Sequence, residues 1–151
     1  MNLVFLDVDY VLNSYRKSKE VYMITGKRHS GKDFPFDEVC LKNLKNLIDR
    51  TNSYIIITSS WRKYEDHMLV LKDKLVEYDL FDRVIGMTEI IGNRICEIDK
   101  FLEGISCNYV ILDDVRDMGK HNEHFVCTDP FYGLVSDDID VAMLKLTKNT
   151  I

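Results

Sequence analysis

A short apolar run at the start of the chain ends in two aspartates that are separated by one residue. Leu3 to Leu6 suffice for a buried strand, and Asp7 and Asp9 follow in the sequence F-L-D-V-D. Because alternate side chains of an extended chain point the same way, both carboxylates can face one direction. Two like charges this close are unfavourable unless a cation or a proton lies between them. The motif therefore predicts a functional site, against the simpler interpretation of a capping Asp and a turn Asp.

Apolar runs and helical periodicities alternate along the rest of the chain. We expect strands over residues 2–6, 54–57, 83–86, 108–112 and 124–127, and helices starting at Asp37 and over 64–78, 94–102 and 137–148. Residues 10–36 have two glycines, a proline and little helical period, which predicts a loop or a hairpin. The pattern is typical of one α/β domain over 1–151, with a parallel sheet covered by helices on both faces.

Charge is distributed unevenly along the chain. The net charge is -5, but residues 16–33 contain six basic and two acidic side chains, so this segment is +4 and the remainder is -9. A basic segment in an otherwise acidic protein can steer a polyanion towards one face. The same charges are equally consistent with a solvent-exposed loop that has no ligand.

Several protein classes are disfavoured. No apolar run reaches the ~20 residues of a membrane span, and the N-terminus lacks a signal-peptide pattern, so we expect a cytoplasmic protein without a membrane partner. The four cysteines form no C-x-x-C pair, which favours reduced, mostly buried thiols over a zinc site. No oligomeric state follows from the sequence.

Polar side chains follow the predicted strands at the points where they end. Parallel strands with right-handed crossovers bring their carboxyl ends to one edge, where open α/β sheets bind ligands. The residues at these ends, beside Asp7 and Asp9, are Thr58, Ser59, Ser60, Trp61, Arg62, Arg94, Asp113, Asp114 and Asp117.

The chemistry of these side chains is that of phosphoryl transfer. Carboxylates suit Mg²⁺, and a hydroxyl at Thr58 and a cation at Arg94 can hold phosphoryl oxygens. An aspartate can attack phosphorus, and a neighbouring acid can protonate the leaving oxygen and then activate water. For Ser59 and Ser60, capping of the next helix is the first interpretation.

The order of these residues resembles the signature of the haloacid dehalogenase (HAD) superfamily of phosphotransferases. That signature is D-x-D after strand one, Thr or Ser after strand two, Lys or Arg before a later helix, and an acidic pair after strand four. The tracts I-I-I-T-S-S-W-R, R-I-C-E-I-D-K-F-L, Y-V-I-L-D-D and T-D-P-F-Y-G-L are similar to those of small, nearly capless phosphatase domains, found alone or attached to RNA-repair and polynucleotide-end-healing proteins. The resemblance implies a Rossmann-like (HAD-like) three-layer sandwich of about five parallel strands, with a small flap insert at about 10–36.

The resemblance also implies roles for the residues that match the signature. Asp7 would be the nucleophile and Asp9 the general acid/base, whose backbone carbonyl also binds metal. Thr58 and Arg94 would bind the phosphoryl group. Asp113 would be a direct Mg²⁺ ligand that Asp114 supports, so that Asp7, Asp9, Asp113 and Asp114 form the metal site.

Other residues are assigned less directly. We expect Ser59 and Arg62 as further contacts to substrate phosphate, while Trp61 fits either a substrate-facing position or the core. Lys100 is the alternative phosphate-binding cation if Arg94 points away. His121 and His124 lie three residues apart, without an evident third metal ligand.

Two departures from the family pattern bear on function. The residue after the second Asp is commonly Gly but is Tyr10 here, which restricts the backbone and would wall the entrance, stack on a base or impair turnover. The family often inserts a cap domain after strand one or strand three. Here the first gap, residues 10–36, has room only for a flap, and the second gap, residues 86–94, is too short for any insert. An open site favours large substrates, and the basic flap suits a nucleic-acid terminus.

The sequence therefore predicts a hydrolase, a Mg²⁺-dependent phosphomonoesterase that acts through an aspartyl-phosphate on a nucleotide or polynucleotide end. One alternative is the same chemistry on a phosphoprotein or small metabolite. Another is a non-catalytic phosphate- or metal-binding module. A response-regulator receiver fits poorly, because its acceptor Asp should follow the third strand and here the acidic doublet follows the fourth.

Overall fold

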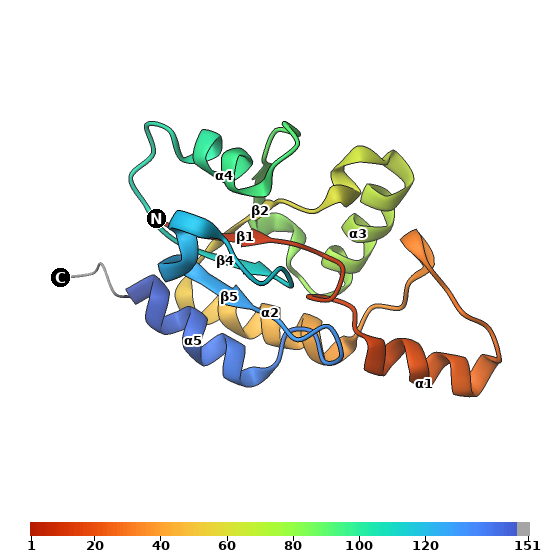
Figure 1. Ribbon diagram of the computed structural model, residues 1–151. Coiled ribbons are helices and arrows are strands. Elements are labelled where there is room, and N and C mark those ends of the chain that lie inside the picture. The colour runs from red at the N-terminus through yellow and green to blue at the C-terminus, as the bar shows by residue number, and fades with distance from the viewer. Residues whose placement is uncertain (148–151) are drawn as a thin grey trace.

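The structure, a computed structural model that describes residues 1–147, is built around one five-stranded sheet (Figure 1). The strands are β1 (Asn2–Leu6), β2 (Tyr54–Ile57), β3 (Val84–Met87), β4 (Asn108–Asp113) and β5 (Phe125–Cys127). Their order is β3-β2-β1-β4-β5, and each pair is parallel. The predicted parallel α/β sandwich is confirmed.

Helices cover both faces of this sheet unequally. The α-helices are α1 (Tyr15–Thr25), α2 (Glu38–Thr51), α3 (Glu65–Glu77), α4 (Arg94–Leu102) and α5 (Ser136–Thr147). Short 3-10 turns lie at η1 (Gly31–Asp33), η2 (Ser60–Lys63), η3 (Phe81–Arg83) and η4 (Gly119–His124). Helices α2, α3 and α5 contribute side chains to the larger core, and α4 packs on the opposite face.

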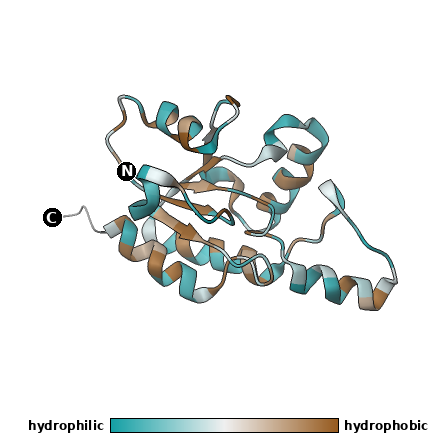
Figure 2. Ribbon diagram, in the orientation of Figure 1, coloured by the Kyte–Doolittle hydropathy of each residue, from teal (hydrophilic) through white to brown (hydrophobic). Residues whose placement is uncertain are grey.

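Side chains of β1 alternate between these two cores. Val4 and Leu6 belong to the larger core, whereas Leu3 and Phe5 pack on the α4 side with Ile98. A central strand that is buried on both faces reads as a continuous apolar run, which is why the strands appear brown in Figure 2.

The backbone ladder continues one residue beyond several strands. The amide of Asp7 donates to the carbonyl of Leu112 at 3.1 Å, and the amide of Thr58 donates to the carbonyl of Leu6 at 2.9 Å. Thr128 donates in the same way to Asp113 at 2.9 Å. These bonds hold the residues after β1, β2 and β5 at the carboxyl edge of the sheet.

The expectation of a loop or hairpin throughout 10–36 is wrong for residues 15–25, which form helix α1. The helix begins where the Ser14 hydroxyl accepts from the amide of Lys17 at 3.1 Å, and it ends at Gly26 with φ 71°. None of its residues is buried. Local capping rather than an apolar stripe defines this helix, so hydrophobic periodicity carries no sign of it.

Three smaller expectations also need correction. Helical spacing predicts that Leu69 and Val76 of α3 face the core, but they are 57% and 53% exposed. Of the four cysteines, all free, only Cys40 is buried. Arg83 lies in η3 and precedes β3.

Within residues 1–147, no helix has the length and apolar character needed to cross a membrane.

The loop after β5 packs tightly on the segment that leads into α1. Gly133 has φ 64°, and a Cβ atom there would lie 2.6 Å from Cys40 Sγ and 2.9 Å from the carbonyl of Asn13. Leu134 then donates to the carbonyl of Val11 at 3.0 Å.

We expect Gly133→Ala to lower the free energy of unfolding by about 3 kcal/mol, through left-handed strain together with overpacking. Gly26→Ala is the matched control, because Gly26 has φ 71° but open space around it, so it should lose only about 1 kcal/mol. Urea denaturation of both variants measures the difference. Equal losses would show that the contact of this loop with residues 11–13 is loose.

Candidate active site

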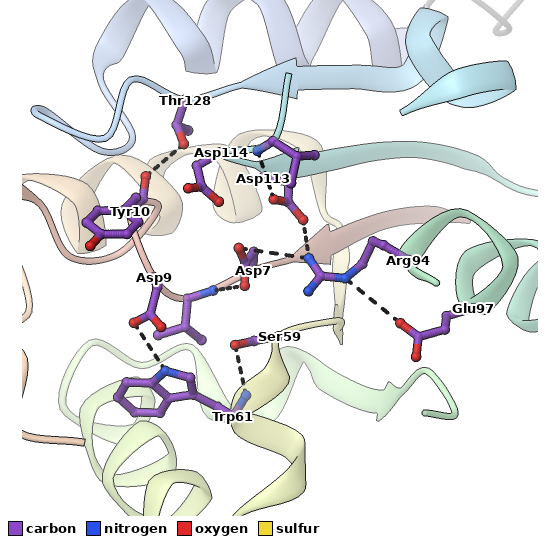
Figure 3. A network of polar contacts seen from close by, with 12 residues as sticks. Asp7, Asp9, Tyr10, Ser59, Trp61, Arg94, Glu97, Asp113, Asp114 and Thr128 are labelled. Carbon is purple, nitrogen blue, oxygen red and sulfur yellow. Dashed lines mark hydrogen bonds and ion pairs between the residues drawn. The ribbon is translucent and has the colours of Figure 1, made fainter. Parts of the chain in front are cut away.

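Three carboxylates meet at the carboxyl edge of the sheet (Figure 3). Asp7 follows β1, Asp113 ends β4 and Asp114 comes next, and one oxygen from each lies within 4.8 Å of the others. Asp7 and Asp113 are buried and Asp114 is half-buried. Among residues 1–147, this is the acidic group in which three side chains approach closely enough to share a metal ion.

One guanidinium group faces these carboxylates. Arg94, the first residue of α4, donates through Nη1 to Asp113 Oδ2, and the same nitrogen lies 3.9 Å from Asp7 Oδ2. The remaining oxygens are held by backbone: Asp7 Oδ1 accepts from the amide of Val8 at 2.8 Å, and Asp113 Oδ1 from the amide of Val115 at 3.2 Å. A single positive charge thus opposes three negative ones.

The surplus of negative charge shifts the pKa values in this cluster. Burial, reinforced by the charge of Asp113, raises the pKa of Asp7 to about 8, although Arg94 acts in the opposite direction. Burial and Asp113 also raise the pKa of Asp114. A proton or a cation is needed to relieve the repulsion. Three carboxylates are a donor set that fits Mg²⁺, which binds hard oxygen ligands.

Asp9 is oriented by a separate set of contacts. Its Oδ1 accepts from Trp61 Nε1 at 3.2 Å and from Asn13 Nδ2 at 3.0 Å. Asn13 also accepts from the amide of Tyr10 at 2.6 Å, so it ties the loop after β1 together. Trp61 is a core residue whose indole nitrogen reaches the site. Sequence reasoning missed Asn13, for which the only signal was an Asn close behind the D-x-D motif.

Thr58 is a buried residue with an unsatisfied hydroxyl. Its Oγ1 has no hydrogen-bond partner within the described part of the chain, and its side chain is fully buried. Buried hydroxyls rarely lack a partner, and each such case calls for an explanation. A ligand oxygen at the sheet edge would supply the missing partner.

Ser59 and Arg62 are engaged by the protein. The Ser59 hydroxyl accepts from the amide of Trp61 at 3.1 Å and caps η2, as the capping interpretation has it. The Arg62 side chain, 2% exposed, donates to the carbonyls of Ser59 and Thr88 at 2.7 and 2.6 Å, and it pairs with Glu97 at 3.2 Å. These contacts brace the loop after β2 against the start of α4.

The structure separates the other candidate cations and histidines from the cluster. Lys100 pairs with Glu89 at 2.6 Å, so Arg94 is the cation that faces the aspartates. His121 lies between Asp99 and Tyr109, with both ring nitrogens at 2.7 Å from their oxygens. It is part of an internal polar contact on the α4 side.

Tyr10 adopts the left-handed conformation that glycine would occupy more easily. Its φ is 63°, and its carbonyl accepts from Thr128 Oγ1 at 2.7 Å. The ring packs on Tyr15, with centroids 4.9 Å apart, and edge-on to Phe34 at 5.7 Å. The ring therefore lies to one side of Asp7, Asp113 and Asp114 (Figure 3).

Comparison with known proteins gives one match. Residues 3–139 match the family model described as the HAD domain in Swiss Army Knife RNA repair proteins. Searches of curated proteins and of solved structures found no match. The matched range contains the candidate site and all the strands except the first residue of β1.

Removal of one charge from the cluster should stabilise the metal-free protein. Unfolded Asp has a pKa near 3.9, whereas burial raises that of Asp7 to about 8. Between these values the folded state binds more protons, so stability falls as pH rises from about 4 to 8. We expect Asp7→Asn to raise the free energy of unfolding at pH 8 by about 1–3 kcal/mol and to flatten this slope.

Urea denaturation at several pH values in the presence of chelator checks this expectation. Asp73→Asn, on the exposed face of α3, is the control for general charge effects. A destabilised Asp7→Asn variant, or one with the pH slope of the wild type, would contradict the repulsion argument.

Proposed function

The chain belongs to the family of HAD domains in Swiss Army Knife RNA repair proteins, and from this membership we propose that it is a Mg²⁺-dependent phosphomonoesterase acting on polynucleotide ends. The observation that carries the proposal is the arrangement at the sheet edge. Asp7 lies beside the guanidinium of Arg94, and the nearby Thr58 hydroxyl has no hydrogen-bond partner among residues 1–147.

Asp7 is the nucleophile of the proposed reaction. Its Oδ1 is held by the amide of Val8, which leaves Oδ2, on the Arg94 side, to attack phosphorus. A new bond forms between Oδ2 and phosphorus while the bond to the leaving oxygen breaks. The product of this step is an aspartyl-phosphate and a free hydroxyl on the substrate.

Asp9 is the general acid and then the general base. It donates a proton to the leaving oxygen, and in the second step it takes a proton from the water that attacks phosphorus. Inorganic phosphate then leaves and Asp7 is regenerated. The hydrogen bonds from Trp61 and Asn13 to Asp9 Oδ1 fix the orientation of the carboxylate, with Oδ2 left for proton transfer.

Asp7, Asp113 and Asp114 are the side chains that would hold Mg²⁺, with the backbone carbonyl of Asp9 as a further ligand. When bound, the ion supplies positive charge that offsets both the carboxylates and the phosphate. Arg94 and the Thr58 hydroxyl donate to the remaining phosphoryl oxygens. Arg94 Nη1 already donates to Asp113, so in the substrate complex the guanidinium would donate to both Asp113 and the phosphoryl group.

A polynucleotide end is the substrate class that the surroundings favour. The family description refers to RNA repair, and α1 with its flanking loop is a basic insert beside the site. Because residues 1–147 place no larger cap over the sheet edge, a terminal phosphate on a long chain can approach. A phosphoprotein, a small metabolite and a non-catalytic binding module remain as outcomes of the test.

The decisive test measures phosphate release from an aryl phosphate, nucleoside monophosphates, a phosphopeptide and oligonucleotides phosphorylated at the 3′ or 5′ end. We expect release that chelator abolishes, with preference for oligonucleotides. Asp7→Asn should retain the fold and lose turnover. Turnover retained in that variant would remove Asp7 as nucleophile, and no release from any substrate would favour a binding module.

The Thr58→Val variant tests whether the hydroxyl binds phosphate, without the loss of stability that would complicate the result. Valine has nearly the same shape and removes a hydroxyl that has no partner, so stability should be unchanged or higher. Loss of a donor to the phosphoryl group should lower turnover by about 10²-fold. Thr58→Ser keeps the hydroxyl and should retain most activity. Equal activity of the valine and serine variants would exclude a role for the hydroxyl.

A further inference from the structure

A cavity lies between α1 and the loop after β5, apart from the aspartate cluster. Its volume is about 470 Å³, within the range of roughly 300–1,000 Å³ typical of ligand pockets. The lining residues are Tyr15, Lys19, Tyr22, Met23, Arg28 and Phe131. Three aromatic rings and two cations thus surround one hollow.

The aromatic side chains of this cavity are unusually open to solvent. Tyr15, Tyr22 and Phe131 are 51%, 40% and 42% exposed, and α1 buries none of its residues. In Figure 1 α1 projects from the side of the molecule, away from the helices that cover the sheet. These rings therefore add little to the core. Tyr10 packs on Tyr15 and Arg28 lies over the Tyr22 ring, and the remaining exposed ring surface is available to a ligand.

The two cations of the cavity, Lys19 of α1 and Arg28 beyond its end, differ from the other basic residues of this helix. Arg16 pairs with Asp37 at 2.7 Å, and Lys17 pairs with Glu38 at 3.0 Å. Lys19 and Arg28 form no ion pair with any residue of 1–147, and the Arg28 guanidinium lies 5.0 Å from the centre of the Tyr22 ring. Their charge is left for an anion.

Backbone hydrogen bonds fix the two walls of the cavity relative to each other. The amide of Tyr15 donates to the carbonyl of Pro130 at 3.0 Å, and the amide of Arg16 donates to the carbonyl of Phe131 at 2.9 Å. The walls are joined before any ligand binds, which lowers the entropic cost of binding.

An aromatic contact connects this cavity to the loop after β1, which carries Asp9. Tyr15 lines the cavity, and its ring lies 4.9 Å from the ring of Tyr10, whose hydroxyl donates to that of Tyr15 at 3.2 Å. Tyr10 directly follows Asp9. A chain that lies along these rings would have its end near Asp9.

From these features we infer that the cavity, defined by Tyr15, Lys19, Tyr22, Met23, Arg28 and Phe131, binds the nucleotides next to the terminal phosphate of a single-stranded polynucleotide. The inference rests on the proposed function, because it extends that substrate away from the reacting end. Open aromatic faces stack on unpaired bases, and unpaired cations contact the phosphodiester backbone. Bases in a duplex are already stacked, so a single strand is the ligand that fits.

Binding is testable without turnover. The probe is a short dye-labelled single-stranded oligonucleotide without a terminal phosphate, titrated in chelator and followed by fluorescence anisotropy. We expect Tyr22→Ala and the Lys19→Ala/Arg28→Ala double variant to weaken binding roughly fivefold or more. The matched duplex should bind more weakly than the single strand.

Phe81 and Lys72 supply the matched controls. Lys72 Nζ lies 5.0 Å from the centre of the Phe81 ring, a cation and an aromatic ring at an exposed position elsewhere on the molecule. Phe81→Ala and Lys72→Ala should leave binding unchanged. Equal losses in the control and cavity variants, or no loss in the cavity variants, would overturn the inference, as would equal binding of duplex.

Kinetics then separate this inference from the proposed phosphatase activity. In Tyr22→Ala, kcat/KM for a phosphorylated oligonucleotide should fall by roughly fivefold or more while turnover of an aryl phosphate is unchanged. Aryl phosphate turnover without oligonucleotide binding would overturn the cavity assignment and leave the phosphatase. Oligonucleotide binding that depends on Tyr22, without turnover of any phosphate, would support the cavity and overturn the phosphatase.

Discussion

Repulsion among Asp7, Asp113 and Asp114 is the constraint around which the carboxyl edge of the sheet is arranged. The ladder between β1 and β4 extends to the amide of Asp7, which places this residue beside Asp113 in a buried position. Arg94 balances one of the three charges, and burial with the remaining repulsion keeps the pKa of Asp7 high. A structure selected only for stability would avoid this cluster, so the local destabilisation is itself an argument for a ligand of opposite charge.

Long-range hydrogen bonds support this edge from outside the cluster. Trp61 reaches from the core to Asp9, while Arg62 joins the loop after β2 to Thr88 and to Glu97 of α4. Because Glu97 also lies 4.0 Å from Arg94 Nε, the loop after β2 and Arg94 share one buried carboxylate. From the sequence, Trp61 and Arg62 could be substrate contacts, but in the structure their N–H groups donate to other residues of the protein. Thr58 is the opposite case, since its hydroxyl is buried and unsatisfied.

Features that depend on local spacing could be predicted from the sequence, whereas contacts that depend on the tertiary structure could not. Strands β1 and β2 and helix α4 have the predicted bounds, because apolar runs and helical spacing report burial directly. The order of polar residues at the strand ends likewise follows from the parallel topology. Helix α1 was missed because caps define it and no side chain is buried. The pairing of Arg62 with Glu97 and the contact of Asn13 with Asp9 depend on tertiary distances, which spacing alone does not determine.

Tyr10 links the carboxyl edge of the sheet to the basic insert. A left-handed backbone at a tyrosine costs about 1–2 kcal/mol relative to glycine, and hydrogen bonds from its amide to Asn13 and from Thr128 to its carbonyl hold it in place. The same backbone turn directs the ring towards Tyr15 and Phe34, on the side where α1 begins. A glycine would relieve the strain but remove the ring that packs on Tyr15 and Phe34. The strain at Tyr10 therefore accompanies the aromatic contact that joins the loop after Asp9 to the start of α1.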